Sequence, residues 1–313
     1  MDNQSDNDVQ LDVSDELVVG LRKALGSCSV NFLFGAGVNG KAFPYFAQFK
    51  KTIGAMNERG LDGSNIETAL ANCADGQIRQ EVLDAFVDEY NSHNNYRLYD
   101  ESLLNLKRML VGFASVVGRA ENRHPETRRL NVFTLNYDRI VEEILEDSGL
   151  FSYTLTQDKA KGRLPFDIVG YNTSTHAFVP TFCVYKLHGS VDTNRTLSAN
   201  NIVFPGQDKL GSILSHFYET LFAMKGELLK RNSALFVIGY SWADDHVNGI
   251  ISDAIAGGLT VYWLQYRSED KLPKQVAGNV IVVPPTNNEN PVDATKTLAD
   301  LLERAGQLLL WEE

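Results

Sequence analysis

The chain has 313 residues, of which 29 are Lys or Arg and 40 are Asp or Glu, so its formal net charge is −11. Hydrophobic residues make up 43% and charged residues 22%, a composition typical of globular proteins that excludes a mostly disordered chain. The acidic excess argues against a general nucleic-acid binder, because such a protein needs Lys and Arg to neutralise phosphates. It leaves room for a small anionic ligand, since a few backbone N–H groups can hold a phosphate.

The three cysteines, Cys28, Cys73 and Cys183, are too few for a four-cysteine zinc site and form no CxxC pair. No disulfide framework is expected, so the predicted compartment is a reducing cytoplasm and the thiols are expected to be buried. The polar N-terminus lacks the parts of a signal peptide, and no apolar run approaches the ~18 residues of a membrane span. We expect a flexible tail over residues 1–14 and a single domain over 15–313.

The first part of the chain predicts one strand followed by a helical insertion. Apolar residues are spaced for one face of a helix over residues 15–26, and the apolar segment Ser29–Phe34 reads as a short strand. From about residue 41 to 120 apolar residues recur at helical spacing, as at Val82 and Phe86. This stretch therefore predicts a helical insertion after the first strand.

From residue 131 onward strands and helices alternate. The expected strands and extended segments are Val132–Leu135, Phe151–Thr156, Phe178–Leu187, Ala234–Gly239, Thr260–Gln265 and Val280–Val283. The expected helices are Ile140–Glu146, Leu210–Leu229, Asp244–Ala256 and Asp293–Leu310. The alternation predicts an α/β fold with a doubly wound parallel sheet, and such folds bind ligands at the carboxyl ends of their strands.

A glycine-rich turn follows the first expected strand. The sequence Gly35-Ala36-Gly37-Val38-Asn39-Gly40 matches GxGxxG, in which glycines let the backbone approach a pyrophosphate. A dehydrogenase-type site would also need a second strand ending in Asp or Glu about 20 residues later, and residues 55–63 contain none. The turn predicts a dinucleotide site outside the standard dehydrogenase pattern, and a glycine turn without a ligand is the alternative.

Polar clusters follow two further expected strands. Asn136 and Asp138 come after Val132–Leu135, where both can address one small polar ligand. The alternative is that Asp138 caps the next helix and Asn136 satisfies a turn. His188 ends the strand Phe178–Leu187 beside a glycine, where a general base is useful, although a lone histidine can equally be structural.

The fourth cluster follows the buried strand Ala234–Gly239. Gly239 and Ser241 suggest a phosphate or ribose contact ahead of a helix N-terminus. The next residues, Asp244, Asp245 and His246, either contact a ligand or only begin the helix by complementing its dipole. The sequence leaves these two interpretations open.

Taken together, the four clusters resemble the sirtuin-like family of the silent information regulator type, over roughly residues 27–310. The resemblance rests on FGAGVNG at 34–40, TLNYD at 134–138, KLHGS at 186–190 and VIGYSWADDHVN at 237–248. It is most similar to bacterial sirtuin-like domains of anti-phage systems. The family has a Rossmann-like sheet that binds NAD, so the resemblance implies NAD as the ligand.

The resemblance also implies a role for each matched residue. Asn136 would position a water or the nicotinamide ribose, Asp138 would face the nicotinamide carboxamide, and His188 would act as the base through the ribose hydroxyls. Gly35, Ala36 and Gly37 would cradle the pyrophosphate, Gly239 and Ser241 would hold the adenosine half, and Gln265 would lie near the adenine ribose. The further expected cofactor contacts are Thr134, Tyr137 and Asp245. Phe43 and Pro44 would line the nicotinamide end.

The departures from the family pattern favour hydrolysis over protein deacylation. The cysteines cannot build the zinc module of protein deacylases, Leu135 stands where their TQN motif has Gln, and the stretch after the glycine turn lacks their S-G-I-P-D-F-R pattern. The resemblance therefore implies an NAD glycohydrolase that releases nicotinamide and ADP-ribose and needs no metal. A binding module for NAD or ADP-ribose without turnover, and a zinc-free deacylase, are the alternatives.

The resemblance also implies a biological setting. We expect an NAD-depleting effector of abortive anti-phage defence, controlled by self-assembly as a homo-oligomer or by a separate partner. In related systems such partners include a HerA-type ATPase, an Argonaute-like protein or another sensing subunit. The sequence does not choose among them, and it predicts neither direct nucleic-acid binding nor membrane binding.

Overall fold

The computed structural model describes residues 13–119, 128–149, 153–155, 166–170, 181–202, 218–285 and 294–309. Within these ranges one sheet has the strand order β3-β4-β5-β2-β1-β6-β7-β8. The strands are β1 (Ser29–Phe34), β2 (Leu130–Thr134), β3 (Tyr153–Leu155), β4 (Phe166–Gly170), β5 (Phe182–Lys186), β6 (Ser233–Ile238), β7 (Thr260–Leu264) and β8 (Val280–Val283).

Among the described residues, one helix precedes β1, four helices lie between β1 and β2, and the later helices are interspersed with the remaining strands. The helices are α1 (Val13–Ser27), α2 (Lys50–Glu58), α3 (Ile66–Asn72), α4 (Gly76–Ser92), α5 (Glu101–Arg119), α6 (Ile140–Asp147), α8 (Tyr218–Leu228), α9 (Asp245–Ala256) and α10 (Ala294–Leu309). The expected helices and strands thus exist, with ends that differ by a few residues. Some predicted residues lie outside the described residues, namely 1–12 of the expected tail, 151–152 and 156 of the expected extended segment, 178–180 of one expected strand, 210–217 of one expected helix, and 293 and 310 of the last.

The sheet confirms the predicted α/β class. Strands β5, β2, β1, β6, β7 and β8 run parallel, while β3 pairs with β4 and β4 with β5 in antiparallel fashion. The sequence had not predicted β4 or this antiparallel edge. Strand β4 (FDIVG) is only five residues long and carries the buried Asp167, so it shows neither clear alternation nor a continuous apolar run.

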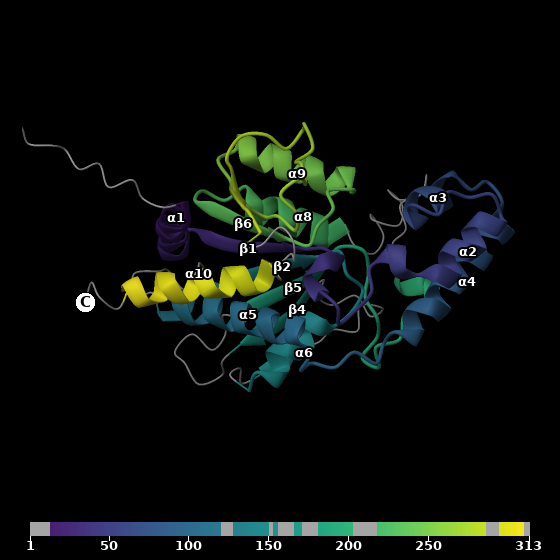
Figure 1. Cartoon of the computed structure of the whole chain (residues 1–313), viewed down its shortest axis with the longest axis horizontal. Helices are drawn as coiled ribbons and strands as arrows, with labels where there is room; N and C mark the ends of the chain where they lie inside the picture. The colour runs from purple at the N-terminus through teal and green to yellow at the C-terminus, as the bar shows by residue number, and fades with distance from the viewer. Residues whose placement is uncertain are drawn as a thin grey trace, which may run out of the picture.

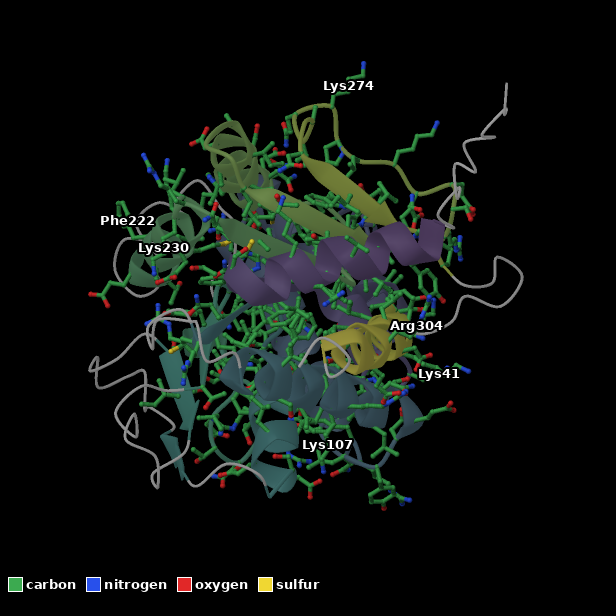
Figure 2. The ribbon with its side chains drawn as sticks, turned by 90° about the vertical axis from the view of Figure 1, so that its left-hand side faces the viewer. Lys41, Lys107, Phe222, Lys230, Lys274 and Arg304 are labelled. Carbon is green, nitrogen blue, oxygen red and sulfur yellow. The ribbon has the colours of Figure 1, made fainter. Side chains whose placement is uncertain are left out.

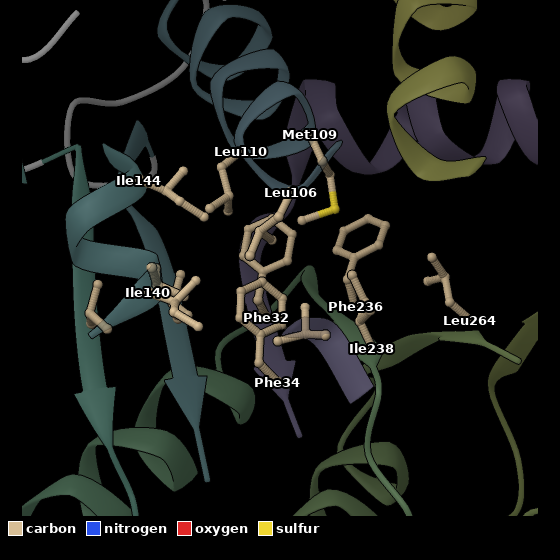
Figure 3. Close-up of a cluster of buried hydrophobic side chains, with 14 of the residues drawn as sticks. Phe32, Phe34, Leu106, Met109, Leu110, Ile140, Ile144, Phe236, Ile238 and Leu264 are labelled. Atoms are coloured by element: carbon tan, nitrogen blue, oxygen red, sulfur yellow. The ribbon is translucent and has the colours of Figure 1, made fainter. Parts of the chain in front are cut away.

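Helices cover both faces of the sheet (Figure 1). One face packs against α1, α5, α6 and α10, and the other packs against α8 and α9. On the first face Phe32 contacts Phe113 edge-to-face at 4.8 Å between ring centroids, and Phe113 meets Phe236 at 5.0 Å. Figure 3 shows this cluster, with Met109 and Leu106 of α5 reaching towards the sheet. Residues such as Leu33 and Leu235 point into the other layer, so the central strands are apolar on both sides.

The stretch expected as an insertion divides into two parts. Helix α5 lies on the sheet, whereas α2, α3 and α4 stand to one side of it (Figure 1). Asp75 caps the start of helix α4, and its side chain accepts hydrogen bonds from the N–H groups of Gln77 and Ile78.

Charged side chains such as those of Lys274 and Arg304 project from the periphery (Figure 2). No helix within the described ranges is long and apolar enough to cross a membrane.

The cysteines are free thiols with unequal exposure. Cys73 and Cys183 are buried, and Cys28 is half-buried, so the expectation of three buried thiols is wrong for Cys28. Burial raises the pKa of the Cys183 thiol to about 11. A raised thiol pKa suppresses the reactive thiolate form at neutral pH.

We expect the native protein to react with a thiol reagent at Cys28 long before Cys183. At pH 8 a thiol with the raised pKa of Cys183 is about 0.1% ionised, and its burial also blocks access. Timed alkylation followed by peptide mass spectrometry measures the order. Labelling in denaturant, where all the cysteines should react together, is the control, and equal native rates at Cys28 and Cys183 would contradict the prediction.

Candidate functional site

The four polar clusters found in the sequence follow four neighbouring strands. The glycine turn comes after β1, the Asn136 cluster after β2, the His188 cluster after β5 and the Gly239 cluster after β6. These strands are adjacent in the order β5-β2-β1-β6 and run parallel, so their carboxyl ends lie on one edge of the sheet. Contacts between segments distant in sequence then join the clusters into one site.

The turns after β1 and β6 touch through their backbones. The N–H of Gly35 donates to the Ile238 carbonyl at 3.1 Å, and the N–H of Gly37 donates to the Gly239 carbonyl at 3.0 Å. A Cβ at Gly35 would lie 2.4 Å from the Gly239 carbonyl oxygen, and one at Gly239 would lie 2.2 Å from the Val38 nitrogen. These glycines are therefore required by packing, whatever ligand the turn binds. Ala36 and Gly37 remain exposed on the outer side of the turn.

Asn136 crosses from the β2 turn to the glycine turn. Its side-chain amide donates to the Gly35 carbonyl at 3.2 Å, and its backbone N–H donates to the Thr134 hydroxyl at 3.1 Å. Asn136 is half-buried, whereas Thr134 is buried and shapes the turn. Thr134 thus helps to shape the turn after β2, and the half-buried Asn136 side chain links this turn to the glycine turn.

Asp138 lies in a buried polar cluster beneath this edge. One carboxylate oxygen accepts from the Ile140 N–H at 3.0 Å, and the other accepts from the Asn39 amide at 2.7 Å. The Lys186 ammonium donates to the Asp138 carbonyl and lies 3.2 Å from a carboxylate oxygen of the buried Glu142. Burial raises the pKa of the Asp138 carboxyl, opposed by Lys186 and by both hydrogen bonds. The bond to Ile140 shows that Asp138 helps to begin α6.

His188 is paired with a carboxylate. Its Nε2 lies 2.9 Å from Oδ2 of Asp244, and both residues are buried. The other oxygen of Asp244 accepts from the N–H groups of His246 and Val247 at 2.9 and 3.0 Å, which caps α9. One side chain therefore begins a helix and orients the histidine. In the tautomer whose Nε2 donates to the carboxylate, Nδ1 carries the lone pair of the ring.

The loop that carries Asp244 is tightly fixed. The Tyr240 hydroxyl donates to Asn248 Oδ1 at 2.9 Å and accepts from the Asp244 N–H at 3.2 Å, while the Asn248 amide donates to the Trp242 carbonyl at 2.9 Å. Trp242 has a left-handed φ of 60°, which is strained for a residue with a side chain. The hydrogen bonds hold this strain in place, so the position of Asp244 depends on them.

The helical insertion reaches the same edge. Tyr90 of α4 packs its ring 5.9 Å from Tyr137 and 4.9 Å from Phe43. Arg195, in the loop after β5, donates to the Asn94 carbonyl of the insertion at 3.3 Å and to both carboxylate oxygens of Glu143 in α6 at 2.9 and 2.6 Å. The insertion and the loops of the sheet are thus fixed to each other at this edge.

The other expected ligand contacts differ in exposure. Ser241, Asp245 and His246 are exposed beside Asp244, whereas Phe43 is buried and packs against Tyr90 and Tyr96. The Gln265 amide donates to the Asp270 carbonyl at 3.0 Å. Gln265 lies at the carboxyl ends of β7 and β8, beside Leu264, Val283, Pro284, Pro285, Ala294 and Thr297.

Sequence reasoning missed several members of the site. It did not single out Asn39, Lys186, Glu142 or Tyr90, and it left open whether Asp244 was a cap or a ligand contact. Asn39 belonged to the glycine-turn motif, and a lysine before His188 in an apolar strand signals a buried charge. Tyr90 carried no signal, because it fits the apolar stripe of an ordinary helix. In the described part of the chain, no group of three or more His, Cys, Asp or Glu residues is placed to hold a metal ion.

Part of the chain resembles a known protein family in sequence. Residues 130–283 match the SIR2-like domain family. The SIR2-like segment begins at β2 and ends at β8, so it contains Asn136, Asp138, His188 and Asp244. The glycine turn and the insertion precede it. None of the curated proteins compared with this chain matches it in sequence.

Solved structures of Sir2 proteins have a similar fold. A Sir2 homologue in complex with 2′-O-acetyl ADP ribose aligns with a TM-score of 0.50 and 14% identity, covering 93% of this chain and 97% of that one. A Sir2 homologue–NAD complex aligns with a TM-score of 0.47 and 13% identity, covering 93% and 94%. At such low identity the likeness concerns the fold alone.

We expect Gly239→Ala to destabilise the protein by about 2 kcal/mol or more. The new methyl group would overlap the Val38 backbone, and the φ of 65° at this position is strained for any residue with a Cβ. The free energy of unfolding from urea denaturation measures the change. Gly249→Ala in α9 is the control, since a Cβ there meets nothing within 4 Å and should be neutral or stabilising. Equal stabilities of the two variants would contradict the packing argument.

Proposed function

We propose that this chain is an NAD glycohydrolase that converts NAD and water into nicotinamide and ADP-ribose. The observation that carries the proposal is the His188–Asp244 pair, held on the same sheet edge as Asn136 and the glycine turn. The match of residues 130–283 to the SIR2-like domain family supports NAD-related chemistry. A Sir2 homologue that aligns with this chain binds 2′-O-acetyl ADP ribose, a derivative of the proposed product.

The proposed reaction breaks the bond between ribose C1′ and the nicotinamide nitrogen. The bonding electron pair stays on that nitrogen, so the pyridinium leaves as neutral nicotinamide and positive charge develops on the ribose. Water then adds to C1′ and releases one proton. The protein must therefore orient the ribose, position the water and accept a proton, all of which side chains can do.

The residues of the edge divide these tasks in our proposal. The glycine turn offers the backbone of the exposed Ala36 to the pyrophosphate, because the Gly37 N–H is already bonded to the Gly239 carbonyl. Asn136 orients the water or the ribose, and Asp138 faces the carboxamide. His188 takes up the proton through the ribose hydroxyls, and the carboxylate of Asp244 stabilises the resulting imidazolium.

We further propose that the hydrolase serves as the NAD-depleting effector of an abortive anti-phage response. Such an activity is harmful when unrestrained, so control would come from assembly into homo-oligomers or from a partner such as a HerA-type ATPase. Expression with and without the neighbouring genes during phage infection, followed by measurement of cellular NAD, tests this setting. Unchanged NAD under all those conditions would overturn it.

Replacement of Asn136 or His188 by alanine should strongly slow nicotinamide release. We expect Asn136→Ala and His188→Ala to lower NAD cleavage by at least about 100-fold, because each removes a positioning or proton-accepting group. Chromatographic measurement of nicotinamide, with the purified protein and with its neighbours, gives the rate.

The matched control is His246→Ala, which removes an exposed histidine next to the same loop. It should retain the parental rate. Tight NAD binding without cleavage in the parental protein would instead indicate a binding module, and lysine release from an acetylated peptide would indicate a deacylase. Either result would overturn the proposed hydrolysis.

Asp244→Asn separates the two roles of Asp244. Asparagine caps helices about as well as aspartate, so the free energy of unfolding should change by less than about 1 kcal/mol. Its amide would donate towards Nε2, which moves the histidine proton to Nδ1 and removes the base. We therefore expect kcat to fall by at least about 100-fold while KM changes little.

Asp75→Asn is the matched control, because Asp75 caps α4 in the same way without contacting a histidine. This variant should keep both its stability and its rate. A parental kcat and pH profile in Asp244→Asn would show that the carboxylate does not position His188 for catalysis.

A further inference from the structure

The loop that follows His188 is held in a tight turn by its own hydrogen bonds. The Asp192 carboxylate accepts from the N–H groups of Asn194 and Thr196, both at 2.8 Å, and the Asp192 N–H donates to the Thr196 carbonyl at 2.9 Å. Arg195 lies within this turn with a left-handed φ of 62°, which is strained for a residue with a side chain. Such strain persists only where the surrounding contacts hold it.

The Arg195 side chain contacts two other segments near the site. Its guanidinium donates to both carboxylate oxygens of Glu143 in α6, a paired geometry that lysine does not reproduce. The guanidinium carbon also lies 4.1 Å from the centroid of the Tyr96 ring, in a cation–π contact. The Tyr96 hydroxyl donates to Glu143 at 3.0 Å, so each of these three side chains contacts the other two.

The backbone of the same loop is bonded to the end of α4. The Asn94 amide donates to the Arg195 carbonyl. The Asn91 side chain donates to the Leu197 carbonyl at 3.0 Å and accepts from the Leu197 N–H at 2.8 Å. The loop is therefore attached to the helical insertion through its main chain as well as through the side chain of Arg195.

The Arg195–Glu143 pair joins the two segments that carry the proposed catalytic groups. One segment runs from His188 to Arg195, and the other runs from the turn after β2 to Glu143 in α6. The Val191 N–H donates to the Tyr137 carbonyl at 2.8 Å, which is a first link between these segments. The ion pair is a second link, farther along both segments. Without it, the loop that continues from the histidine loses its attachment to α6.

We propose that Arg195 is a positioning residue, which holds His188 at its working distance from the turn after β2. This inference rests on the proposed function and adds the helical insertion to its requirements. The insertion residues Asn91, Asn94 and Tyr96 hold the Arg195 loop and precede the segment that matches the SIR2-like family. Positioning matters because a shift of about 1 Å in a reacting group can slow a reaction up to about 100-fold.

The test compares Arg195→Ala with a matched control, Arg59→Ala. Arg59 donates to Glu81 at 2.8 Å and to the Ala55 carbonyl at 3.1 Å, and its side chain is 29% exposed against 31% for Arg195. All partners of Arg59 named here lie within the insertion. Nicotinamide release over a range of NAD concentrations gives kcat and KM. Hydrogen exchange followed by mass spectrometry reports opening of residues 188–197 without NAD.

We expect Arg195→Ala to lower kcat about 10-fold while KM changes by less than about twofold, because the histidine shifts while the glycine turn remains. Hydrogen exchange over 188–197 should become faster in this variant. Arg59→Ala should keep the parental kcat and the parental exchange over 188–197. Arg195→Lys is a second variant that keeps the charge without the paired geometry, so its kcat should lie between those of the parent and Arg195→Ala.

A double variant tests whether Arg195 acts through Glu143. Glu143→Gln alone should lower kcat, and adding it to Arg195→Ala should cause no further loss, because both changes remove the same contact. Losses that multiply in the double variant would show that the two side chains act separately, and would overturn the inference.

Two further outcomes would also overturn it. A parental kcat in Arg195→Ala means that the ion pair does not position the histidine. Equal losses of kcat in Arg195→Ala and Arg59→Ala mean that any lost ion pair has the same effect. In both cases the parental protein releases nicotinamide. Absence of release by the parental protein would instead refute the proposed function, and hydrogen exchange would still decide whether Arg195 holds the loop.

Discussion

The site depends on a close backbone contact between glycines of the turns after β1 and β6. Gly35 and Gly37 on one turn meet Gly239 on another at distances that a single Cβ would prevent. Because β1 and β6 are neighbours, this contact continues their pairing beyond the last strand residues and brings the two turns together. The glycine motif, commonly interpreted as a phosphate cradle, here has a packing role that comes before any ligand.

The second requirement of the edge is a compensated buried charge. Lys186 ends β5 inside the protein and bonds both to the Asp138 carbonyl and to Glu142. Burying an ion pair is costly, and removing either partner would leave an uncompensated charge. The lysine therefore connects the carboxyl end of β5 to the turn after β2 and to the first turn of α6. The polar cluster around Asp138 thus has a structural basis in this buried charge.

The sequence allowed the sheet to be predicted because its central strands are continuous apolar runs, and β6 (SALFVI) is the clearest of them. It also placed the four clusters at strand ends. It could not supply β4, whose five residues lack a pattern, or the pairing of His188 with Asp244, which are 56 positions apart. Contacts of that range depend on tertiary packing, and for Tyr90 local spacing gave only the appearance of an ordinary helical core residue.

The Asp244 carboxylate both caps α9 and pairs with His188, so the two features form together during folding. His188 acquires its partner only when the first turn of α9 has formed, because the same side chain holds both. A nascent or partly unfolded chain therefore lacks an oriented imidazole, even if it already contains every required residue. In the proposed hydrolase, the catalytic histidine would therefore be oriented only after α9 has begun to form.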